Sequence, residues 1–548
     1  MTDKVNKDFN DILQNEGEEF LNDYFSSVLE EAKADLPALE LQAALEKEKA
    51  DKEKAAAEKA AEDKKNKEIC YRVFSGDLSD LSNSNRLFIL YGKIIRRNID
   101  SGEWLTYSDG KWSSIGKDND ELLFLTCKVA KYIEENRPLP NITQNADGSI
   151  VRDESKEEYP KELIDFGNAL LNRWKKTSKQ RNAIVLLKGN ATIRINQADL
   201  DKNPMLLNVK NGVVDLETGK LMQAAPELLL TKQANVIFDP AARAPVFEEF
   251  LQQILPDELT RAAVLRFLGY CLTGRINEEK SLFIWGRGGN GKGTLLQTVL
   301  KLFGSYATSF SINALLKPKF PRDGETATPE LAKLEGARLA VVEEIPRGAI
   351  FDVAKFKNLT GGDEIPIRPL YQPARVIKDP MFKFIFSGND LPRLESADDE
   401  GFNRRLLVTK FLQQFTGANA DLTLKGRLAA PAEFAGIFNI LLAECLAWQS
   451  KGLIQSEAME TEKETYLADN DWFSDFISEC CELGAGYDIS RKDLLAALKG
   501  YDSRAADGKD NDLERMFGEL DGVSIEKDSR HGKYKGAKFF KGIHLIKS

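Results

Sequence analysis

Short apolar runs that end in polar or glycine-rich segments mark the middle of the chain. Such runs lie at 281–285, 339–342 and 382–386, and their length is that of buried strands. Segments with apolar residues at helical spacing separate them. The pattern predicts an α/β domain whose central part lies between about Leu282 and Phe415.

A second folded region is predicted upstream of this domain, over residues 71–275. At 103–112 an Asp-Gly pair separates two strand-like runs, which indicates a hairpin. The segment at 206–221 has the pattern of three short strands with Asn-Gly and Thr-Gly pairs at the corners. Residues 246–274 then carry apolar positions at helical spacing and end at a glycine. We expect an α+β accessory domain.

Residues 1–70 have a different pattern, rich in Ala, Glu and Lys and almost without an apolar stripe. Strong helix formers without an apolar face are typical of a charged, solvated helical tail or tether. An oligomerising coiled coil is the alternative, but it requires apolar a and d positions that this segment does not sustain.

The last region, residues 466–548, is predicted to contain three short helices near 472–483, 491–501 and 513–520. A strand pair is expected inside 533–546. This order of elements resembles a winged helix. Lysines exceed acids in the final hairpin, so either a solvated sheet edge or a DNA-contacting wing at Lys533 and Lys535 fits the pattern.

The composition fits a multidomain globular protein. The chain has 548 residues, of which 42% are hydrophobic and 30% are charged, and this length suggests about two to four domains. A net charge of −10 argues against a protein that coats nucleic acid, so any DNA site must be local. No signal peptide and no apolar run of about 20 residues stands out, which favours a cytoplasmic protein without a membrane span.

The composition also limits the available chemistry. The chain has two histidines and six cysteines, none of the latter in a C-x-x-C pair. Zinc ribbons, disulfide frameworks and imidazole-based catalysis are therefore disfavoured.

The segment SLFIWGRGGNGKGTLL, residues 281–296, has the pattern of a P-loop: an apolar strand, a glycine-rich turn and a helix. Glycines leave backbone amides bare, so that they can surround a polyphosphate, and Lys292 opposes its charge. A plain glycine turn before a helix is the alternative. The residues expected to bind nucleotide are Gly286, Gly288, Gly289, Asn290, Gly291, Lys292, Gly293 and Thr294. Gly293 occupies the usual position of the magnesium-binding hydroxyl, which comes one residue later, at Thr294.

Two further strands end in polar residues. One is followed by Glu343 and Glu344, a Walker B pattern. If this strand lies next to the P-loop strand, one carboxylate reaches the Mg²⁺ shell, with Thr294 as another oxygen ligand, and the other approaches the attacking water. The second strand ends at Asn389, whose amide fits a sensor of the γ-phosphate. A solvated pair of acids and a turn asparagine are the alternatives.

Five motifs follow one another along the chain: GxGGNGKGT, strand-EE, K-x-x-TGGD-x-x-x-x-R, strand-S-G-N and G-F-x-R-R. In this order they resemble the superfamily III helicases of the phage and plasmid primase C-terminal type, which are related to poxvirus primase-helicases. The resemblance extends upstream into the helicase-preceding domain. It implies an AAA+ motor at 276–465 that uses ATP and Mg²⁺. It also implies that Arg404 or Arg405 serves as an arginine finger in a neighbouring subunit, although a surface ion pair remains the alternative.

The same resemblance implies a pore hairpin that contacts DNA through Lys357, Arg368 and Tyr371. Roughly six copies around a ring would supply a basic spiral even though each chain is acidic. The expected function is therefore that of a ring-forming, hexameric helicase that moves 3′ to 5′ on single-stranded DNA.

The expected setting is replication of a phage or mobile element in a bacterial cell, on forked DNA and beside a separate primase or polymerase. An origin-melting ATPase or helicase loader and a non-catalytic nucleotide-binding scaffold remain as alternatives.

Overall fold

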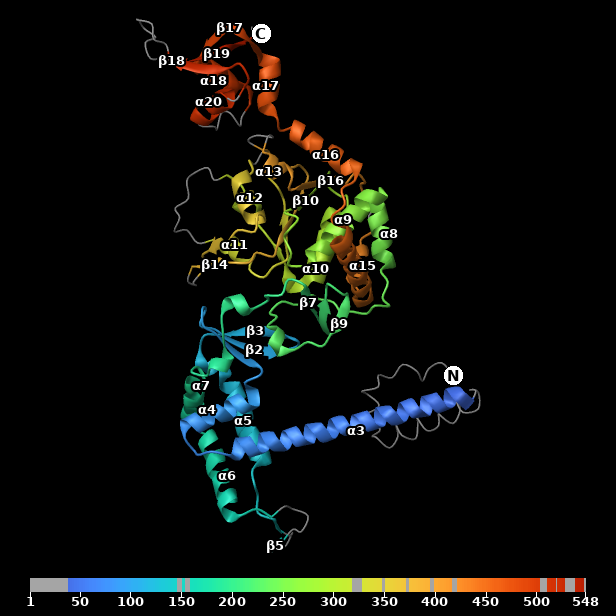
Figure 1. Cartoon of the computed structure of the whole chain (residues 1–548), viewed down its shortest axis with the longest axis vertical. Helices are drawn as coiled ribbons and strands as arrows, with labels where there is room; N and C mark the ends of the chain where they lie inside the picture. Colours follow the sequence, from blue (N-terminus) through green and yellow to red (C-terminus); the bar gives the residue numbers. More distant parts are fainter. Residues whose placement is uncertain are drawn as a thin grey trace. The chain divides into compact units, whose positions relative to one another are not determined.

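A computed structural model describes most of the chain beyond residue 37. The described residues are 38–144, 150–152, 158–317, 328–346, 350–370, 374–394, 399–415, 421–502, 510–518, 520–527 and 538–546. They fall into two compact units (Figure 1). The first comprises the chain up to Gly92 together with residues 122–190, and the second comprises residues 93–121 together with 191–548.

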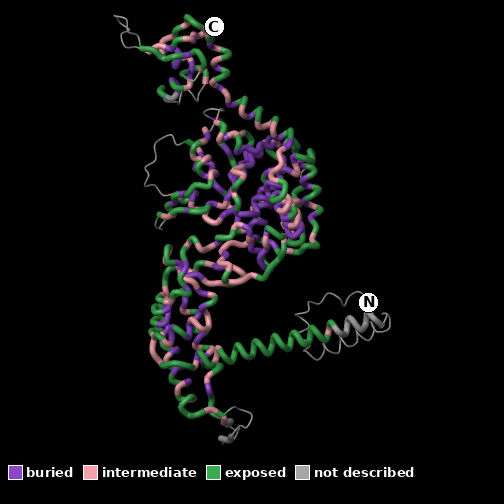
Figure 2. The backbone as a smooth tube through the Cα atoms, in the orientation of Figure 1, coloured by how far each residue is buried: buried purple, intermediate pink, exposed green. Residues whose placement is uncertain are grey.

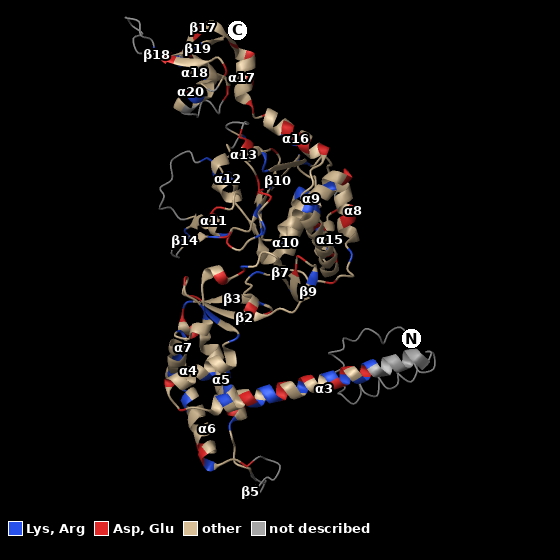
Figure 3. Cartoon of the chain, viewed as in Figure 1, with Lys and Arg blue, Asp and Glu red and all other residues tan. Residues whose placement is uncertain are grey.

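The first unit is mainly helical. Its elements are α3 (Ala38–Phe74), α4 (Asp80–Tyr91), α5 (Leu123–Asn136), β4 (Ile142–Gln144), β5 (Ile150–Arg152), α6 (Lys161–Trp174) and α7 (Thr177–Leu187). Trp174, Leu87 and Ile133 are buried in its core. From residue 47 onward α3 is exposed almost to its end and carries alternating cations and acids (Figures 2 and 3). The predicted charged helix is confirmed over Ala38–Phe74, and the rest of the expected tail lies outside the described residues.

The second unit begins with a small sheet of order β3-β2-β1-β6. Its strands are β1 (Ile95–Asn98), β2 (Trp104–Ser108), β3 (Lys111–Gly116) and β6 (Arg194–Ile195). β2 and β3 form the predicted hairpin. Asp109 and Gly110 have φ of 50° and 76°, the left-handed values that an Asp-Gly hairpin turn requires.

The three predicted strands that follow are also present, as β7 (Leu206–Val209), β8 (Gly212–Asp215) and β9 (Lys220–Met222). The first corner differs from the prediction by one residue. Val209 pairs with Gly212, so the turn consists of Lys210 and Asn211, and Gly212 is already in the strand. A Cβ on Gly212 would lie 2.6 Å from the Met222 carbonyl oxygen, so this glycine permits close strand pairing rather than forming the corner.

A parallel five-stranded sheet of order β11-β12-β15-β10-β16 forms the centre of the second unit. Its strands are β10 (Ser281–Trp285), β11 (Ala307–Ser309), β12 (Leu339–Glu343), β15 (Lys383–Gly388) and β16 (Leu406–Lys410). The three strands predicted from apolar runs are confirmed. The acid-bearing strand β12 was expected to lie next to the P-loop strand β10. This expectation was wrong, because β15 lies between them.

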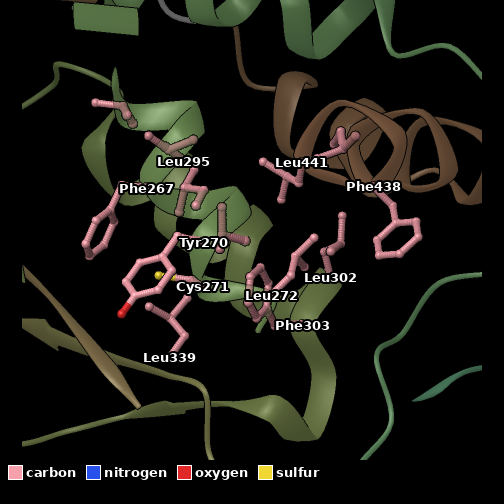
Figure 4. Close-up of a cluster of buried hydrophobic side chains, with 14 of the residues drawn as sticks. Phe267, Tyr270, Cys271, Leu272, Leu295, Leu302, Phe303, Leu339, Phe438 and Leu441 are labelled. Atoms are coloured by element: carbon pink, nitrogen blue, oxygen red, sulfur yellow. The ribbon is translucent and has the colours of Figure 1, made fainter. Parts of the chain in front are cut away.

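Helices cover both faces of this sheet, because alternate residues of each strand point to opposite sides. Leu282, Leu339 and Ile385 join one core with α8 (Pro245–Ile254), α9 (Glu258–Cys271), α10 (Lys292–Phe303) and α15 (Pro431–Lys451) (Figure 4). Phe283, Ala340 and Phe386 join the other core with α11 (Pro329–Ala332), α12 (Val353–Thr360), α13 (Glu400–Asn403) and α16 (Glu457–Ala468). The predicted helical segment 246–274 therefore forms two helices, α8 and α9.

Helix α15 is long and apolar enough to cross a membrane by length and composition alone. The sequence had indicated no segment of this kind. Within its most apolar 18-residue window, 56% of the helix is buried, and Phe438 and Leu441 pack in the core beside α9 (Figure 4). Core helices of globular proteins have the same properties, so this finding is weak evidence for a membrane span.

The C-terminal part of the unit has its own core, which includes Trp472, Leu494 and Phe540. Its elements are α17 (Trp472–Cys480), β17 (Cys481–Ser490), α18 (Arg491–Tyr501), α20 (Asp510–Gly518), β18 (Ser524–Lys527) and β19 (Lys538–Leu545). The three helices are present as predicted. The strands form an antiparallel sheet of order β17-β19-β18. β17 was not predicted, and β18 lies before the segment expected to hold the strand pair.

Two cations are buried at the amino ends of β12 and β15. Arg338 donates hydrogen bonds to the carbonyl oxygens of Leu272 and Leu206. The Lys383 ammonium donates to the carbonyl oxygens of Thr273 and Met381 and lies 4.8 Å from the Tyr270 ring centre. Burial disfavours the charged amine and lowers the pKa of Lys383 to about 7.

This burial makes stability depend on pH. Between about pH 7 and the ordinary pKa of lysine, unfolded Lys383 binds a proton that the folded protein has released, so the free energy of unfolding should rise with pH over this window. We expect the gain in melting temperature between pH 7 and pH 9.5 to be smaller in Lys383→Met than in the parent. Lys378→Met, which removes an exposed lysine, should keep the gain. Equal pH profiles for Lys383→Met and the parent would contradict this expectation.

Candidate active site

The carboxyl ends of three central strands bring the predicted site segments to one edge of the sheet. Trp285 of β10 pairs with Gly388 of β15, and Ser387 pairs with Glu343 of β12. The residues that follow these strand ends, which include the P-loop, Glu344 and Asn389, therefore lie at the same level. Binding sites of open parallel sheets lie at this edge.

The P-loop follows β10, and its backbone requires glycine at two positions. Gly286 has φ of 147°, and a Cβ there would lie 2.4 Å from the Phe411 carbonyl oxygen. Gly291, the residue before α10, has φ of 85°, and a Cβ would lie 2.5 Å from Ile254 Cγ2. A side chain at Gly288 would meet no protein atom within 4 Å. Gly286 and Gly291 are thus required by the fold itself, whereas the protein leaves space around Gly288.

Lys292, the first residue of α10, is held inside the loop. Its ammonium donates to the Gly286 carbonyl oxygen at 2.6 Å and to Asn290 Oδ1 at 3.0 Å. Lys292 is buried, and this burial lowers the pKa of its ammonium. A cation at a helix amino end, beside bare backbone amides, is an arrangement that binds phosphate.

The segment after β16 is hydrogen-bonded to the P-loop and to the end of β10. Phe411 N donates to the Trp285 carbonyl oxygen at 2.8 Å, and Phe415 N donates to the Gly289 carbonyl oxygen at 2.7 Å. The side-chain amide of Asn290 donates to the Phe411 carbonyl oxygen at 3.3 Å. Asn290, predicted as a nucleotide-binding residue, therefore also joins the loop to the end of β16.

The P-loop borders a cavity of about 260 Å³. Its lining contains Gly288, Gly289, Asn290, Gly291, Lys292, Gly293, Thr294, Ser387 and Lys425. Both Gly293 and Thr294 line the cavity, so the residue that carries the displaced hydroxyl still borders the site. Ser387 and Lys425 were not predicted as site residues. Lys425 belongs to the short helix α14 (Leu424–Leu428), and no motif marks it, because a lone lysine in a polar segment resembles any solvated residue.

Removing the Lys425 ammonium should weaken nucleotide binding. A second cation beside Lys292 adds to the attraction for a polyphosphate, and its loss should raise the KM for ATP about tenfold. We expect kcat to change less than KM in Lys425→Ala. The control is Lys301→Ala, which removes an exposed lysine from the last turn of α10. A steady-state ATPase titration measures both constants, and an unchanged KM for Lys425→Ala would rule out the contact.

The two acids and the asparagine expected to act on the phosphate lie at the same edge. Glu343, Glu344 and Asn389 are all exposed. Glu344 has φ of 60°, a left-handed conformation that is rare for glutamate and typical of residues held by a functional constraint. Carboxylates and hydroxyls are oxygen donors of the kind that Mg²⁺ accepts, and Thr294 lines the cavity. Glu343, Glu344 and Asn389 lie at the same edge of the sheet but are not among the residues that line the cavity. The P-loop residues thus fit a nucleotide, and the acids are near enough in the fold to be candidates for its magnesium ion.

The two candidate arginine fingers lie at the opposite edge of the sheet. Arg404 and Arg405 precede β16, and Ser281 N at the start of β10 donates to the Arg405 carbonyl oxygen at 2.8 Å. The P-loop follows the other end of β10, about 16 Å away for a five-residue strand. Neither guanidinium is therefore placed to serve the P-loop of its own chain.

The environments of these two arginines differ. Arg405 is buried and donates to the Gly401 carbonyl oxygen. The Arg404 side chain is 64% exposed. Of the two, only Arg404 presents its guanidinium at the surface, whereas Arg405 is held inside the subunit.

The predicted DNA-contacting residues are only partly described. β13 (Ile365–Ile367) and β14 (Arg375–Ile377) form the expected hairpin, and Arg368 is exposed beyond β13. Lys357 lies on α12, where its ammonium pairs with Asp399 at 2.6 Å. Tyr371, Lys533 and Lys535 lie outside the described residues. A DNA contact by any of these residues stays a prediction.

Comparison with known families gives two matches. Residues 84–256 match the family described as D5 N terminal like, and residues 284–405 match a family of unknown function, DUF5906. The second match includes the P-loop, Glu343 and Arg404. The two matches together cover most of the accessory region and the central sheet.

Several viral proteins have sequences similar to this chain. The chain is 29% identical over 302 residues to a protein named "Putative helicase" from Acanthamoeba polyphaga mimivirus, which covers 51% of this chain and 31% of the relative. It is 30% identical over 237 residues to a "Putative helicase" of Invertebrate iridescent virus 6, with 41% and 24% covered. A "Putative primase" of African swine fever virus is 25% identical over 179 residues, with 32% and 18% covered. The chain spans less than a third of the length of these relatives.

Among solved structures, the C-terminal region of NrS-1 aligns with a TM-score of 0.43 and 14% identity, covering 85% of this chain and 100% of that one.

The sequence matches support a relation to D5-like viral helicases and primases of DNA replication.

Proposed function

We propose that this chain is an ATP-driven, ring-forming DNA helicase of superfamily III. The one observation that carries the proposal is the position of Lys292 and Arg404 at opposite edges of the same sheet. Among the described residues that line the cavity beside the P-loop there is no arginine, and Arg287 of the loop is exposed outside it. Because the exposed Arg404 lies at the other edge of the sheet, a second subunit would supply the guanidinium that completes the site.

Within one subunit, the P-loop amides and Lys292 hold the phosphates of ATP, and Lys425 adds a second cation. Glu343 and Glu344 hold the metal ion and orient the attacking water, and Asn389 contacts the terminal phosphate. Mg²⁺, when bound, neutralises charge on the phosphate oxygens. The position of β15 between β10 and β12 supports this assignment and the AAA+ architecture, because it puts Asn389 between the P-loop and the two acids.

In the neighbouring subunit, Arg404 stabilises the charge that develops on the transferred phosphoryl group. Hydrolysis then depends on assembly, and repetition of the same contact around a closed ring of six subunits completes every site. Arg368, beyond β13, contacts single-stranded DNA in the channel. Tyr371, Lys533 and Lys535, which lie outside the described residues, are proposed as further DNA contacts. The names of two viral relatives, each given as "Putative helicase", support a helicase function.

A strand-displacement assay tests the function. The full chain, ATP and Mg²⁺ are incubated with a long duplex that has either a 3′ or a 5′ single-stranded tail, and release of the labelled strand is followed. We expect release from the 3′-tailed substrate, and hydrolysis that single-stranded DNA stimulates. Stimulated hydrolysis without release would instead identify an origin-melting ATPase or a loader, and absence of hydrolysis would identify a nucleotide-binding scaffold.

A further inference from the structure

One carboxylate, that of Glu279, holds both arginines that precede β16. Glu279 Oε2 forms an ion pair with Arg405 Nη2 at 2.7 Å and accepts a hydrogen bond from Arg404 Nη2. The Glu279 side chain is 31% exposed, compared with 64% for Arg404 and 7% for Arg405. The contact to Arg405 is thus an internal ion pair, whereas the contact to Arg404 lies at the surface.

The backbone around Glu279 is fixed in place. Glu279 has φ of 51°, a conformation that a non-glycine residue adopts only where its surroundings hold it. Its amide donates to the Ile276 carbonyl oxygen at 2.9 Å, which closes a turn immediately before β10. The carboxylate is therefore presented at a defined position beside the start of β16.

The backbone of Arg404 is fixed as well, while its side chain is not enclosed. Phe402 of α13 is fully buried, with ring centres 5.4 Å from Phe356 and 5.9 Å from Phe351. Asp399, the residue before α13, is held by Lys357. Any movement of the Arg404 guanidinium must therefore come from its own side-chain torsions, and the contact that opposes such movement is the one with Glu279.

We propose that Glu279 is a positioning residue that holds the Arg404 guanidinium at the subunit surface and competes for it with the ATP phosphates of the neighbouring subunit. This inference rests on the proposed function. A guanidinium that is held by a carboxylate is oriented before the subunits meet, and the phosphate takes its place as the anionic partner when ATP is bound across the interface. Binding of ATP in one subunit thereby breaks a contact in the next.

Neutralising Glu279 should strengthen nucleotide binding. The glutamine in Glu279→Gln can still accept a hydrogen bond but no longer competes as an anion, so the dissociation constant of a fluorescent non-hydrolysable ATP analogue should fall about threefold to tenfold in the assembled protein. We expect a matching fall in the KM for ATP and a smaller change in kcat. The matched control is Glu278→Gln, since the neighbouring Glu278 bonds Trp448 and has no bond to Arg404.

A double-mutant cycle separates positioning from structural support. If Glu279 acts through Arg404, then Glu279→Gln should leave analogue binding unchanged in an Arg404→Ala background. Glu279→Gln should also change the melting temperature, because the buried Arg405 loses its ion pair. This change should be the same with Arg404 present and in the Arg404→Ala background. Should Glu279→Gln fail to fold, Glu279→Asp keeps the charge but draws it back from Arg404, and it should tighten binding in the same direction.

Tighter binding that persists in the Arg404→Ala background, or no change in binding at all, would overturn the inference. The proposed function fails by a different result, namely that neither Lys292→Ala nor Arg404→Ala alters hydrolysis. Loss of hydrolysis in those two variants, together with an Arg404-independent effect of Glu279→Gln, would remove only the role of Glu279.

Discussion

Replacing Lys292 with alanine is expected to reduce ATP turnover of the assembled protein by roughly 10²–10³-fold. The Lys292 ammonium lies inside the P-loop, 2.6 Å from the Gly286 carbonyl oxygen, at a buried position where a charge acts with little screening. Removal of one preorganised group that stabilises transition-state charge typically has an effect of this size. Steady-state hydrolysis with single-stranded DNA present measures it.

The fold should tolerate the Lys292→Ala change, because Asn290 keeps its own bond to the Phe411 carbonyl oxygen. We therefore expect the melting temperature to stay within a few degrees of the parent, and the oligomeric state to be unchanged. Lys301→Ala serves as the control for loss of a lysine from the same helix. Retention of normal turnover by Lys292→Ala would exclude this loop as the catalytic phosphate site.

Replacing Arg404 is expected to reduce kcat by about 10³-fold, which is the lower part of the range for an arginine finger. Arg404→Ala should keep its melting temperature, because the side chain is largely exposed. Arg405→Ala should behave differently, since it leaves Glu279 and the Gly401 carbonyl oxygen without a buried partner. We expect that variant to unfold at a lower temperature, by an amount that corresponds to about 3 kcal/mol.

Mixed oligomers give the sharper test of Arg404. A Lys292→Ala subunit carries an intact arginine, and an Arg404→Ala subunit carries an intact P-loop. Equal mixing of these two inactive variants should restore part of the hydrolysis, because some interfaces then combine an intact loop with an intact finger. A mixture that stays as inactive as its components would show that Arg404 does not act between subunits. Mixing Lys292→Ala with Lys292→Ala/Arg404→Ala provides the negative control.

Local patterns were sufficient to predict three of the five strands of the central sheet, whereas β11 and β16 were not predicted. The strand of Leu282 and the strand of Leu339 are short apolar runs in sequence, and both are buried strands in the structure. Their order in the sheet could not be predicted in the same way. Register and neighbours depend on which faces the helices cover, and this information is spread over both cores rather than contained in any one strand.

The site shows the same division between local and long-range information. Lys292, Glu344 and Asn389 were predicted because each belongs to a motif that follows a strand, and the structure places them at one edge. Lys425 was missed because the chain brings it to the loop only through tertiary folding. The choice between Arg404 and Arg405 also required the structure, since two adjacent arginines are equivalent in sequence and differ only in burial.

β16 is an edge strand, paired on one side alone, with β10. Arg404 lies just before it, and the bonds of Phe411 and Phe415 to the P-loop lie just after it. Under the proposed function, the same strand connects the pocket of the next subunit to the pocket of its own. Because the backbone at Arg404 is held in place by Phe402 and Asp399, β16 keeps the arginine that reaches outward at a constant distance from the bonds that hold the P-loop.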